Sequence, residues 1–249
     1  AAPVGDPVGS GRQTGPVITV EHLGRLVPGP AARDAGVTCL PANNNLDLCR
    51  FADRLWLAWR TAPTHFASAE ARIEVVSAPG VEGPWRHETT HAVGADLREP
   101  RFVATDDRLH LFCLELGTDA KRFQPRRVHH LRTTGDGTGW APPTVAFEAG
   151  VVPWRIRRLD GRWALLGYRN GEAMYGPRPV DPVVEVRWCD DLEAWSDPVD
   201  LHPGGIECEL LELPDGRIIG LTRNEGPSRR GSDVLVGPDL THLTVHPIA

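Results

Sequence analysis

The sequence of 249 residues is poor in lysine and contains no long apolar run. Lys121 is the only lysine, against 26 arginines, and the formal net charge is −6. An acidic balance of this kind implies no general affinity for nucleic acid. No apolar run approaches the ~20 residues that a membrane-spanning helix needs, so no membrane span is expected. Segments of helical periodicity longer than about one turn are missing as well, which predicts an all-β fold.

Paired cysteines are also missing. The five cysteines are odd in number and include no Cys-x-x-Cys spacing, which argues against a disulfide scaffold and against a zinc site. Cys49, Cys113 and Cys208 fall within predicted strands, where cysteine acts as a small apolar core residue. We therefore expect neither a bound metal nor a cofactor.

The sequence does contain a repeated hairpin. In Cys208–Arg223, two apolar segments flank Asp215-Gly216, a dipeptide that favours a tight turn because glycine adopts positive φ without steric cost. The same pattern of strand, turn and strand occurs three more times. The turn arginines recur every 54 or 55 residues, at Arg54, Arg108, Arg162 and Arg217. An all-β unit repeating at such a period indicates a β-propeller.

The repeats predict the blades. They run from about residue 43 to 92, 97 to 149, 151 to 202 and 205 to 249, and each adds two strands after its hairpin. We expect four-stranded antiparallel blades in one domain over residues 17–249, after a disordered arm over residues 1–16. Four or five blades are both compatible with this length. Residues 28–41 are read as loop, and Val17–Glu21 as a strand that closes the propeller by pairing with the last blade.

The first residues also suggest a location. They are rich in proline and glycine and contain no methionine, which is typical of a mature exported chain. Secretion is therefore expected, with a cytoplasmic location as the alternative.

Three repeats share a further turn after their third strand, and each of these turns ends in tryptophan, at Trp85, Trp140 and Trp195. These turns resemble degenerate Asp boxes, the Ser-x-Asp-x-Gly-x-x-Trp turns of sialidases and related propellers.

Other segments resemble blades of the same proteins, namely Asn45–Phe51, Asp96–Pro100 and Glu207–Arg223. Over roughly residues 40–240 the chain thus resembles the sialidase-like β-propeller glycoside hydrolases. The resemblance implies a carbohydrate or other small-molecule substrate and an active site at one mouth of the propeller channel.

Charged residues recur where the inner strands begin. Aligned on the hairpins, one position holds Asn45, Glu99, Pro153 and Glu207, and the position two residues later holds Asp47, Arg101, Arg155 and Glu209. Residues two apart on a strand share a face, so this face carries charges that are costly to bury unless they pair or meet a ligand. A glycosidase needs two carboxyl groups in different environments, one neutral and one ionised. We therefore predict acid–base or nucleophilic roles for Asp47, Glu99 and Glu207. Ion pairs that line the channel are the alternative.

Arginines follow the second strands at similar points, at Arg60, Arg169 and Arg223. A guanidinium can bind a carboxylate through two parallel hydrogen bonds, which favours an anionic sugar, and pairing between blades is the alternative. His65 is a further candidate for substrate binding. Tyr168 is a catalytic candidate as a nucleophile. The expected substrate-binding set is completed by Asn45, Arg98 and Arg155.

Two other functions would use the same residues. A sugar-binding propeller without catalysis would keep the arginine contacts but would need no pair of perturbed carboxylates. A propeller polysaccharide lyase would use His65 or Tyr168 as a base on a uronic acid neutralised by arginine. The loops at residues 121–127 and 170–182 are expected to cover the mouth of the pocket in each case.

Overall fold

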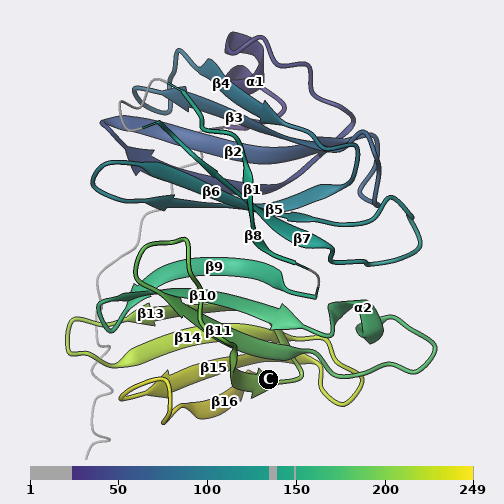
Figure 1. Cartoon of the computed structure of the whole chain (residues 1–249), viewed down its shortest axis with the longest axis vertical. Coiled ribbons are helices and arrows are strands. Elements are labelled where there is room, and N and C mark those ends of the chain that lie inside the picture. The colour runs from purple at the N-terminus through teal and green to yellow at the C-terminus, as the bar shows by residue number, and fades with distance from the viewer. Residues whose placement is uncertain (1–23, 135–138, 149, 249) are drawn as a thin grey trace, which may run out of the picture.

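A computed structural model of the chain describes residues 24–134, 139–148 and 150–248. These residues form four antiparallel sheets of four strands, arranged as the blades of a four-bladed β-propeller. The first two blades occupy the upper half of Figure 1 and the last two occupy the lower half. The predicted Val17–Glu21 strand lies outside the described residues.

Within each blade the strands are ordered in space as in the chain. Blade 1 comprises β1 (Ala42–Phe51), β2 (Arg54–Ala62), β3 (Arg72–Ala78) and β4 (Arg86–His91). Blade 2 comprises β5 (Leu97–Ala104), β6 (Leu109–Glu115), β7 (Arg127–Arg132) and β8 (Thr144–Phe147). Blade 3 comprises β9 (Val152–Leu159), β10 (Arg162–Arg169), β11 (Val183–Cys189) and β12 (Val199–Pro203). Blade 4 comprises β13 (Gly205–Glu212), β14 (Ile218–Asn224), β15 (Gly231–Gly237) and β16 (Thr244–Ile248).

The first hairpins of blades 1 and 3 show why the turn residues are where they are. Ala52 and Asp53 have φ of 47° and 56°, and Asp160 and Gly161 have φ of 49° and 70°. Positive φ at both central residues defines the type I′ turn, whose twist matches that of the flanking strands. The predicted hairpins are therefore confirmed at these positions.

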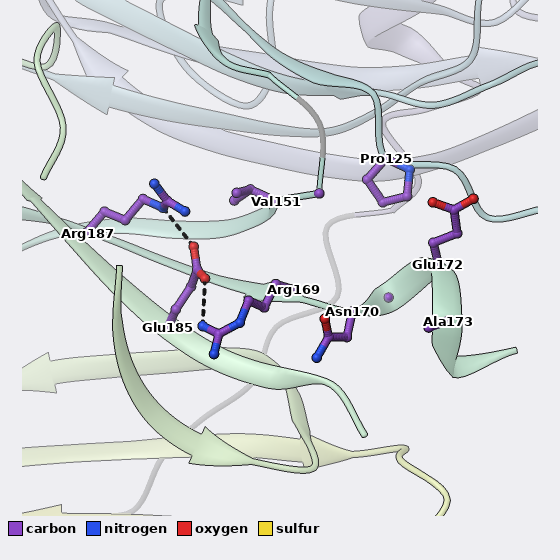
Figure 2. A pocket seen from close by; sticks show the side chains of 10 residues that line it. Pro125, Val151, Arg169, Asn170, Glu172, Ala173, Glu185 and Arg187 are labelled. Atoms are coloured by element: carbon purple, nitrogen blue, oxygen red, sulfur yellow. Dashed lines mark hydrogen bonds and ion pairs between the residues drawn. The ribbon is translucent and has the colours of Figure 1, made fainter. Parts of the chain in front are cut away.

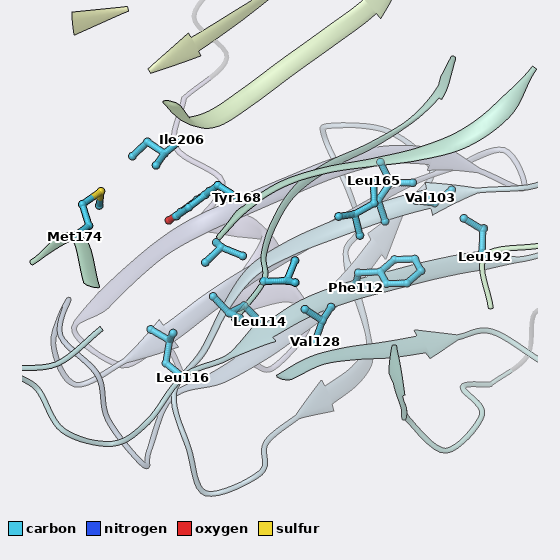
Figure 3. Close-up of a cluster of buried hydrophobic side chains, with 13 residues drawn as sticks. Val103, Phe112, Leu114, Leu116, Val128, Leu165, Tyr168, Met174, Leu192 and Ile206 are labelled. Carbon is cyan, nitrogen blue, oxygen red and sulfur yellow. The ribbon is translucent and has the colours of Figure 1, made fainter. Parts of the chain in front are cut away.

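Apolar clusters fill the interfaces between consecutive blades. Between blades 2 and 3, Phe112 and Leu114 pack in one cluster with Leu165 and Tyr168 (Figure 3). Similar clusters join blade 1 to blade 2 and blade 3 to blade 4. Each fully buried leucine or phenylalanine contributes roughly 1.5–3 kcal/mol, so these interfaces hold the blades in place.

Residues 28–41, which the sequence predicts to be a loop, cover part of the face of blade 1 that is turned away from blade 2. A short helix, α1 (Pro30–Asp34), begins at a proline whose fixed φ suits the first helical turn. Its Ala31 and Ala32 are buried against Leu57 and Trp59 of β2. The only other helix in the described part of the chain is α2 (Gly171–Met174). Neither helix is long and apolar enough to cross a membrane.

Candidate functional site

The inner strands are interrupted at the same place in every blade. The pairing register shifts between Asn44 and Leu46 in β1, between Arg98 and Arg101 in β5, and between Ile206 and Glu209 in β13. In blade 3 the shift lies opposite Pro153–Arg155. Such β-bulges bend the strand and redirect a side chain, and they are common beside active sites.

Three of these bulges contain a residue in a left-handed backbone conformation. Asn45, Glu99 and Glu207 have φ of 48°, 49° and 52°. This conformation is uncommon for residues other than glycine and costs of order 1–3 kcal/mol. Proline cannot adopt it, so Pro153 is the exception among the four blades. The three residues occupy the position that the sequence alignment placed at the start of the inner strands.

All three face one pocket with a volume of about 490 Å³. Side chains from every blade, and from the loops between their strands, line it. Its polar lining consists of Asn45, His65, Arg98, Glu99, Lys121, Arg122, Tyr168, Tyr175, Glu207, Arg223 and Glu225.

Glu99 is the more enclosed carboxylate. Its side chain is 13% exposed and accepts hydrogen bonds from Asn45 Nδ2 at 2.5 Å and from Arg101 Nη2 at 2.5 Å. Burial raises the pKa of Glu99, and the charge of Glu207 raises it further, although Arg101 opposes both effects. A carboxyl group in such a place stays protonated to higher pH than an exposed one.

Glu207 lies in a more open environment. Its side chain is 28% exposed and pairs with Arg223, whose Nη1 lies 3.3 Å from Oε2. Arg223 also contacts Glu225, with 2.6 Å between Nη2 and Oε2. The pocket therefore contains two carboxyl groups in unlike environments, because Glu99 is more enclosed than Glu207.

Tyr168 lies beside both carboxylates on the wall of the pocket. Burial raises its pKa well above the usual range, and the charges of Glu99 and Glu207 act in the same direction. The phenol therefore stays neutral at ordinary pH and can donate a hydrogen bond. Tyr175 lies in the same pocket and is 61% exposed.

His65 and Arg98 also line the pocket, and each is already held by protein groups. The Asn44 amide lies 2.9 Å from His65 Nδ1. Arg98 donates from Nη2 to the carbonyl oxygen of His65 at 2.6 Å and from Nε to Asp96 Oδ2 at 2.5 Å. Contacts within the protein thus hold both side chains in place at the edge of the pocket.

Four predicted site residues lie outside the pocket lining. Asp47 accepts a hydrogen bond from the backbone N–H of Phe102 at 2.7 Å, so its carboxylate joins blade 1 to blade 2. Arg60 is fully buried against Asp96, with 2.7 Å between Nη2 and Oδ1. Arg155 pairs with Glu209 at 2.6 Å between Nε and Oε2, on the next inner strand.

Arg169 is the fourth, and the register explains its location. On the second strands, the residues that pair with the position just before Asn45, Glu99, Pro153 and Glu207 are Arg60, Leu114, Tyr168 and Arg223. Tyr168, rather than Arg169, is therefore equivalent to Arg60 and Arg223, and a shift of one residue turns a strand side chain to the opposite face. Arg169 instead binds Glu185 and Asp200 and lines a second pocket of about 460 Å³ (Figure 2).

Several lining residues were not singled out from the sequence as individual candidates, including Phe66 and Glu225. Lys121 and Tyr175 lie on the two loops that were expected to cover the mouth, and both loops do line the pocket. Glu225 comes directly after β14 and two residues after Arg223. Residues two apart on a strand share a face, so this spacing could have predicted that Glu225 lies beside Arg223 in the pocket. Within the described residues, no group of three or more His, Cys, Asp or Glu side chains is arranged to hold a metal ion.

Comparison with known proteins gives neighbours by structure only. No protein-family model matches the sequence, and no curated protein matches it either. Zg3597, a family 117 glycoside hydrolase of Zobellia galactanivorans, is similar with a TM-score of 0.59 and 10% identity over 84% of this chain and 70% of that one.

Two other solved structures have a similar fold. Trypanosoma rangeli sialidase has a TM-score of 0.61 and 8% identity over 83% of this chain and 38% of the sialidase. An N-acetylgalactosamine deacetylase from F. plautii has a TM-score of 0.59 and 12% identity over 82% of this chain and 68% of that one. The chain thus matches well under half the length of the sialidase. At these identities the likeness shows a shared propeller fold, in agreement with the resemblance noted in the sequence.

Proposed function

We propose that this chain is a glycoside hydrolase in which Glu99 and Glu207 are the catalytic carboxyl groups. The observation that carries the proposal is the pair of left-handed bulges that turn these two glutamates into one pocket from different blades. Strained backbone persists only where the surrounding structure enforces it, and it clusters at active sites, ligand clamps and switch regions. The propeller fold shared with glycoside hydrolases is consistent with this function.

Glu99 is suited to the role of general acid. Its raised pKa keeps a proton available, and the bonds from Asn45 and Arg101 fix the orientation of the carboxyl group. In hydrolysis, Glu99 gives this proton to the oxygen of the leaving group as the glycosidic bond breaks.

Glu207 is suited to the complementary role, because its carboxylate is more open to solvent than that of Glu99 and pairs with Arg223. It either takes a proton from the attacking water or bonds directly to the anomeric carbon, depending on its distance from Glu99. Tyr168 is expected to donate a hydrogen bond to the substrate or to a carboxylate. A role as general base would require the phenolate, which burial disfavours, so a lyase that uses Tyr168 as its base is the weaker alternative.

The charge of the rim supports an anionic substrate. Arg98, Lys121, Arg122 and Arg223 line the pocket and outnumber its three glutamates. A carboxylate or sulfate on the sugar would be attracted to this rim, and its affinity should fall as salt concentration rises.

The test uses a panel of neutral and acidic aryl glycosides with the variants Glu99→Gln and Glu207→Gln. Loss of a general acid or base should lower kcat by about 10²–10⁴. Glu212→Gln is the matched control, because Glu212 lies on the same strand as Glu207 but is exposed and outside the pocket. Wild-type rates in both active-site variants would refute the assignment. Saturable sugar binding by a chain that cleaves none of the panel would establish the sugar-binding alternative.

A further inference from the structure

Blade 3 differs from the other blades beside the bulge of its inner strand. Pro153 stands at the position that Asn45, Glu99 and Glu207 occupy elsewhere, and it is not part of the pocket lining. The next residue is Trp154, whereas the equivalent residues of the other blades are Leu46, Pro100 and Cys208. Blade 3 thus has a large aromatic side chain at a point where no other blade has one.

Trp154 contacts two arginines of the inner strands, each in two ways. Its carbonyl oxygen accepts hydrogen bonds from Arg101 Nε and, at 2.9 Å, from Arg155 Nη1. The indole ring lies against the same two guanidinium groups, with 4.5 Å between its centroid and Cζ of Arg101 and 5.3 Å to Cζ of Arg155. A cation over the face of an indole is attracted by the ring quadrupole, most strongly where water is excluded. Trp154 therefore fixes the position of both guanidinium groups.

Arg101 extends these contacts to the candidate general acid. Its side chain is 4% exposed, and its Nη2 donates to Glu99 Oε2 at 2.5 Å. Its Nη1 donates to the carbonyl oxygen of Pro100, on its own strand, at 3.0 Å. Among the described residues, Trp154 thus supplies the only hydrogen-bond acceptor that this guanidinium finds in another blade.

Arg155 connects Trp154 to blade 4. Its Nε donates to Glu209 Oε2 at 2.6 Å, and Arg157 donates to both oxygens of the same carboxylate, at 2.8 and 2.9 Å. Contacts between polar groups therefore run without a break from Glu209 in blade 4, through Trp154 in blade 3, to Glu99 in blade 2.

We propose that Trp154 is a positioning residue that acts through Arg101 to hold the Glu99 carboxyl group in place for proton transfer. This inference rests on the function proposed for Glu99. Asn45 and Arg101 each bind one oxygen of that carboxyl group, and arginine has many rotamers unless its own contacts restrict them. Without the indole ring, Arg101 would be less restricted. A displacement of about 1 Å at a catalytic group can lower the rate about 10²-fold.

The same contacts influence the charge of Glu99. Burial raises the pKa of Glu99, and the charged groups that act on it are Arg101, Glu207, Arg98 and Arg155, of which the arginines lower the pKa and the glutamate raises it. Tyr168, which also lies beside Glu99, stays neutral. Trp154 holds two of the three arginines, so loss of its ring should allow both to move away and should raise the pKa of Glu99 further.

The first test is a titration of Glu99 in the full chain, followed by NMR of the carboxyl carbon and assigned with Glu99→Gln. Trp154→Ala should raise the pKa of Glu99 by at least about 0.5 pH unit, and Trp154→Phe, which keeps an aromatic face, should recover most of that change. Trp188→Ala is the matched control. Trp188 lies in the same blade and stacks against Arg162 at 5.6 Å, but it is outside the pocket lining. A wild-type pKa in Trp154→Ala would overturn the proposal.

Turnover provides a second measurement. In Trp154→Ala, kcat should fall by about 10–10²-fold, and the alkaline limb of the pH profile should move to higher pH. A purely structural role would leave that limb in place, and an unchanged limb would overturn the proposal. The titration needs no turnover, so a chain that cleaves no glycoside would refute the proposed function while the titration still decides the role of Trp154.

A measurement on the wild-type chain covers the case in which Trp154→Ala does not fold. The Nε–H of Arg101 is buried and bonded to the carbonyl oxygen of Trp154. It should therefore exchange with solvent at least about tenfold more slowly than the Nε–H of Arg33, whose side chain is 74% exposed. Equal exchange rates at the two arginines would overturn the proposal.

Discussion

Arg60 allows a sharp test of how the rim of the pocket is built. Its guanidinium uses all five N–H donors within the protein. Nε and Nη2 donate to Asp96 Oδ1 at 2.9 and 2.7 Å, Nη1 donates to Asn44 Oδ1 and to the carbonyl oxygen of Thr64 at 3.2 Å each, and Nη2 donates to the carbonyl oxygen of Phe66 at 3.0 Å. Both Arg60 and Asp96 are fully buried. The residue therefore anchors the loop that carries His65.

Replacing Arg60 by methionine should destabilise the fold strongly. Removal of one partner from a buried ion pair costs about 3–5 kcal/mol, because the other charge is left without compensation. Asp96 would still accept the bond from Arg98 at 2.5 Å, which places the expected loss near 3 kcal/mol. For a domain of this size that corresponds to a decrease in Tm of about 6–12 °C.

The assay is urea unfolding at neutral pH, with ligand affinity measured in parallel. Arg60→Lys keeps the charge but loses the planar donor set, so its stability should fall between those of the wild type and Arg60→Met. Arg60→Met combined with Asp96→Asn should recover part of the loss, because no unpaired charge remains. A loss below 1 kcal/mol in Arg60→Met would refute the view that Arg60 is structural and would return it to the list of substrate-binding candidates.

Three further predictions follow from pKa shifts and packing. His110 and His130 are buried, which lowers their pKa values to about 4 and about 3. The stability they contribute should be complete above pH 6.5 and be lost as pH falls toward 4, by on the order of 3 kcal/mol per histidine. In urea unfolding, the free energy of wild type and His130→Gln should differ in its pH dependence in that range, and equal slopes there would contradict the shift. The pKa of Glu99 is raised on folding by burial, so wild-type stability should fall relative to Glu99→Gln as pH rises above the ordinary glutamate pKa, and parallel pH profiles would contradict the shift. Gly171→Ala would bring a methyl group within 2.9 Å of the Phe123 ring, so it should displace the pocket wall and weaken ligand binding, whereas unchanged affinity would show that this wall is adaptable.

The fold could be predicted from the sequence because its determinants are local. Turn dipeptides such as Asp160-Gly161 fix the hairpins, and their repetition at 54 or 55 residues fixes the number of repeats. The sequence allowed four or five blades, and the described residues form four sheets, so the propeller has four blades. Helix α1 was missed because its five residues are too few to show periodicity.

The candidate site was predictable only in part. The alignment of the repeats placed Asn45, Glu99 and Glu207 at equivalent positions, and the structure brings them to one pocket. The partners of the arginines depend on contacts between blades, which no repeat pattern encodes. Arg60 and Arg223 are equivalent in register, yet one is buried against Asp96 and the other is half exposed beside Glu207.

The single lysine has a practical consequence for labelling. Lys121 contains the only side-chain amine in the sequence, and it is exposed on the lining of the pocket. An amine-selective reagent therefore has one side-chain target, which lies where a ligand would bind. A fluorophore or photocrosslinker attached there would report occupancy of the pocket without any engineered residue. Protection of Lys121 from modification by a bound sugar would provide a binding assay that requires no knowledge of the reaction.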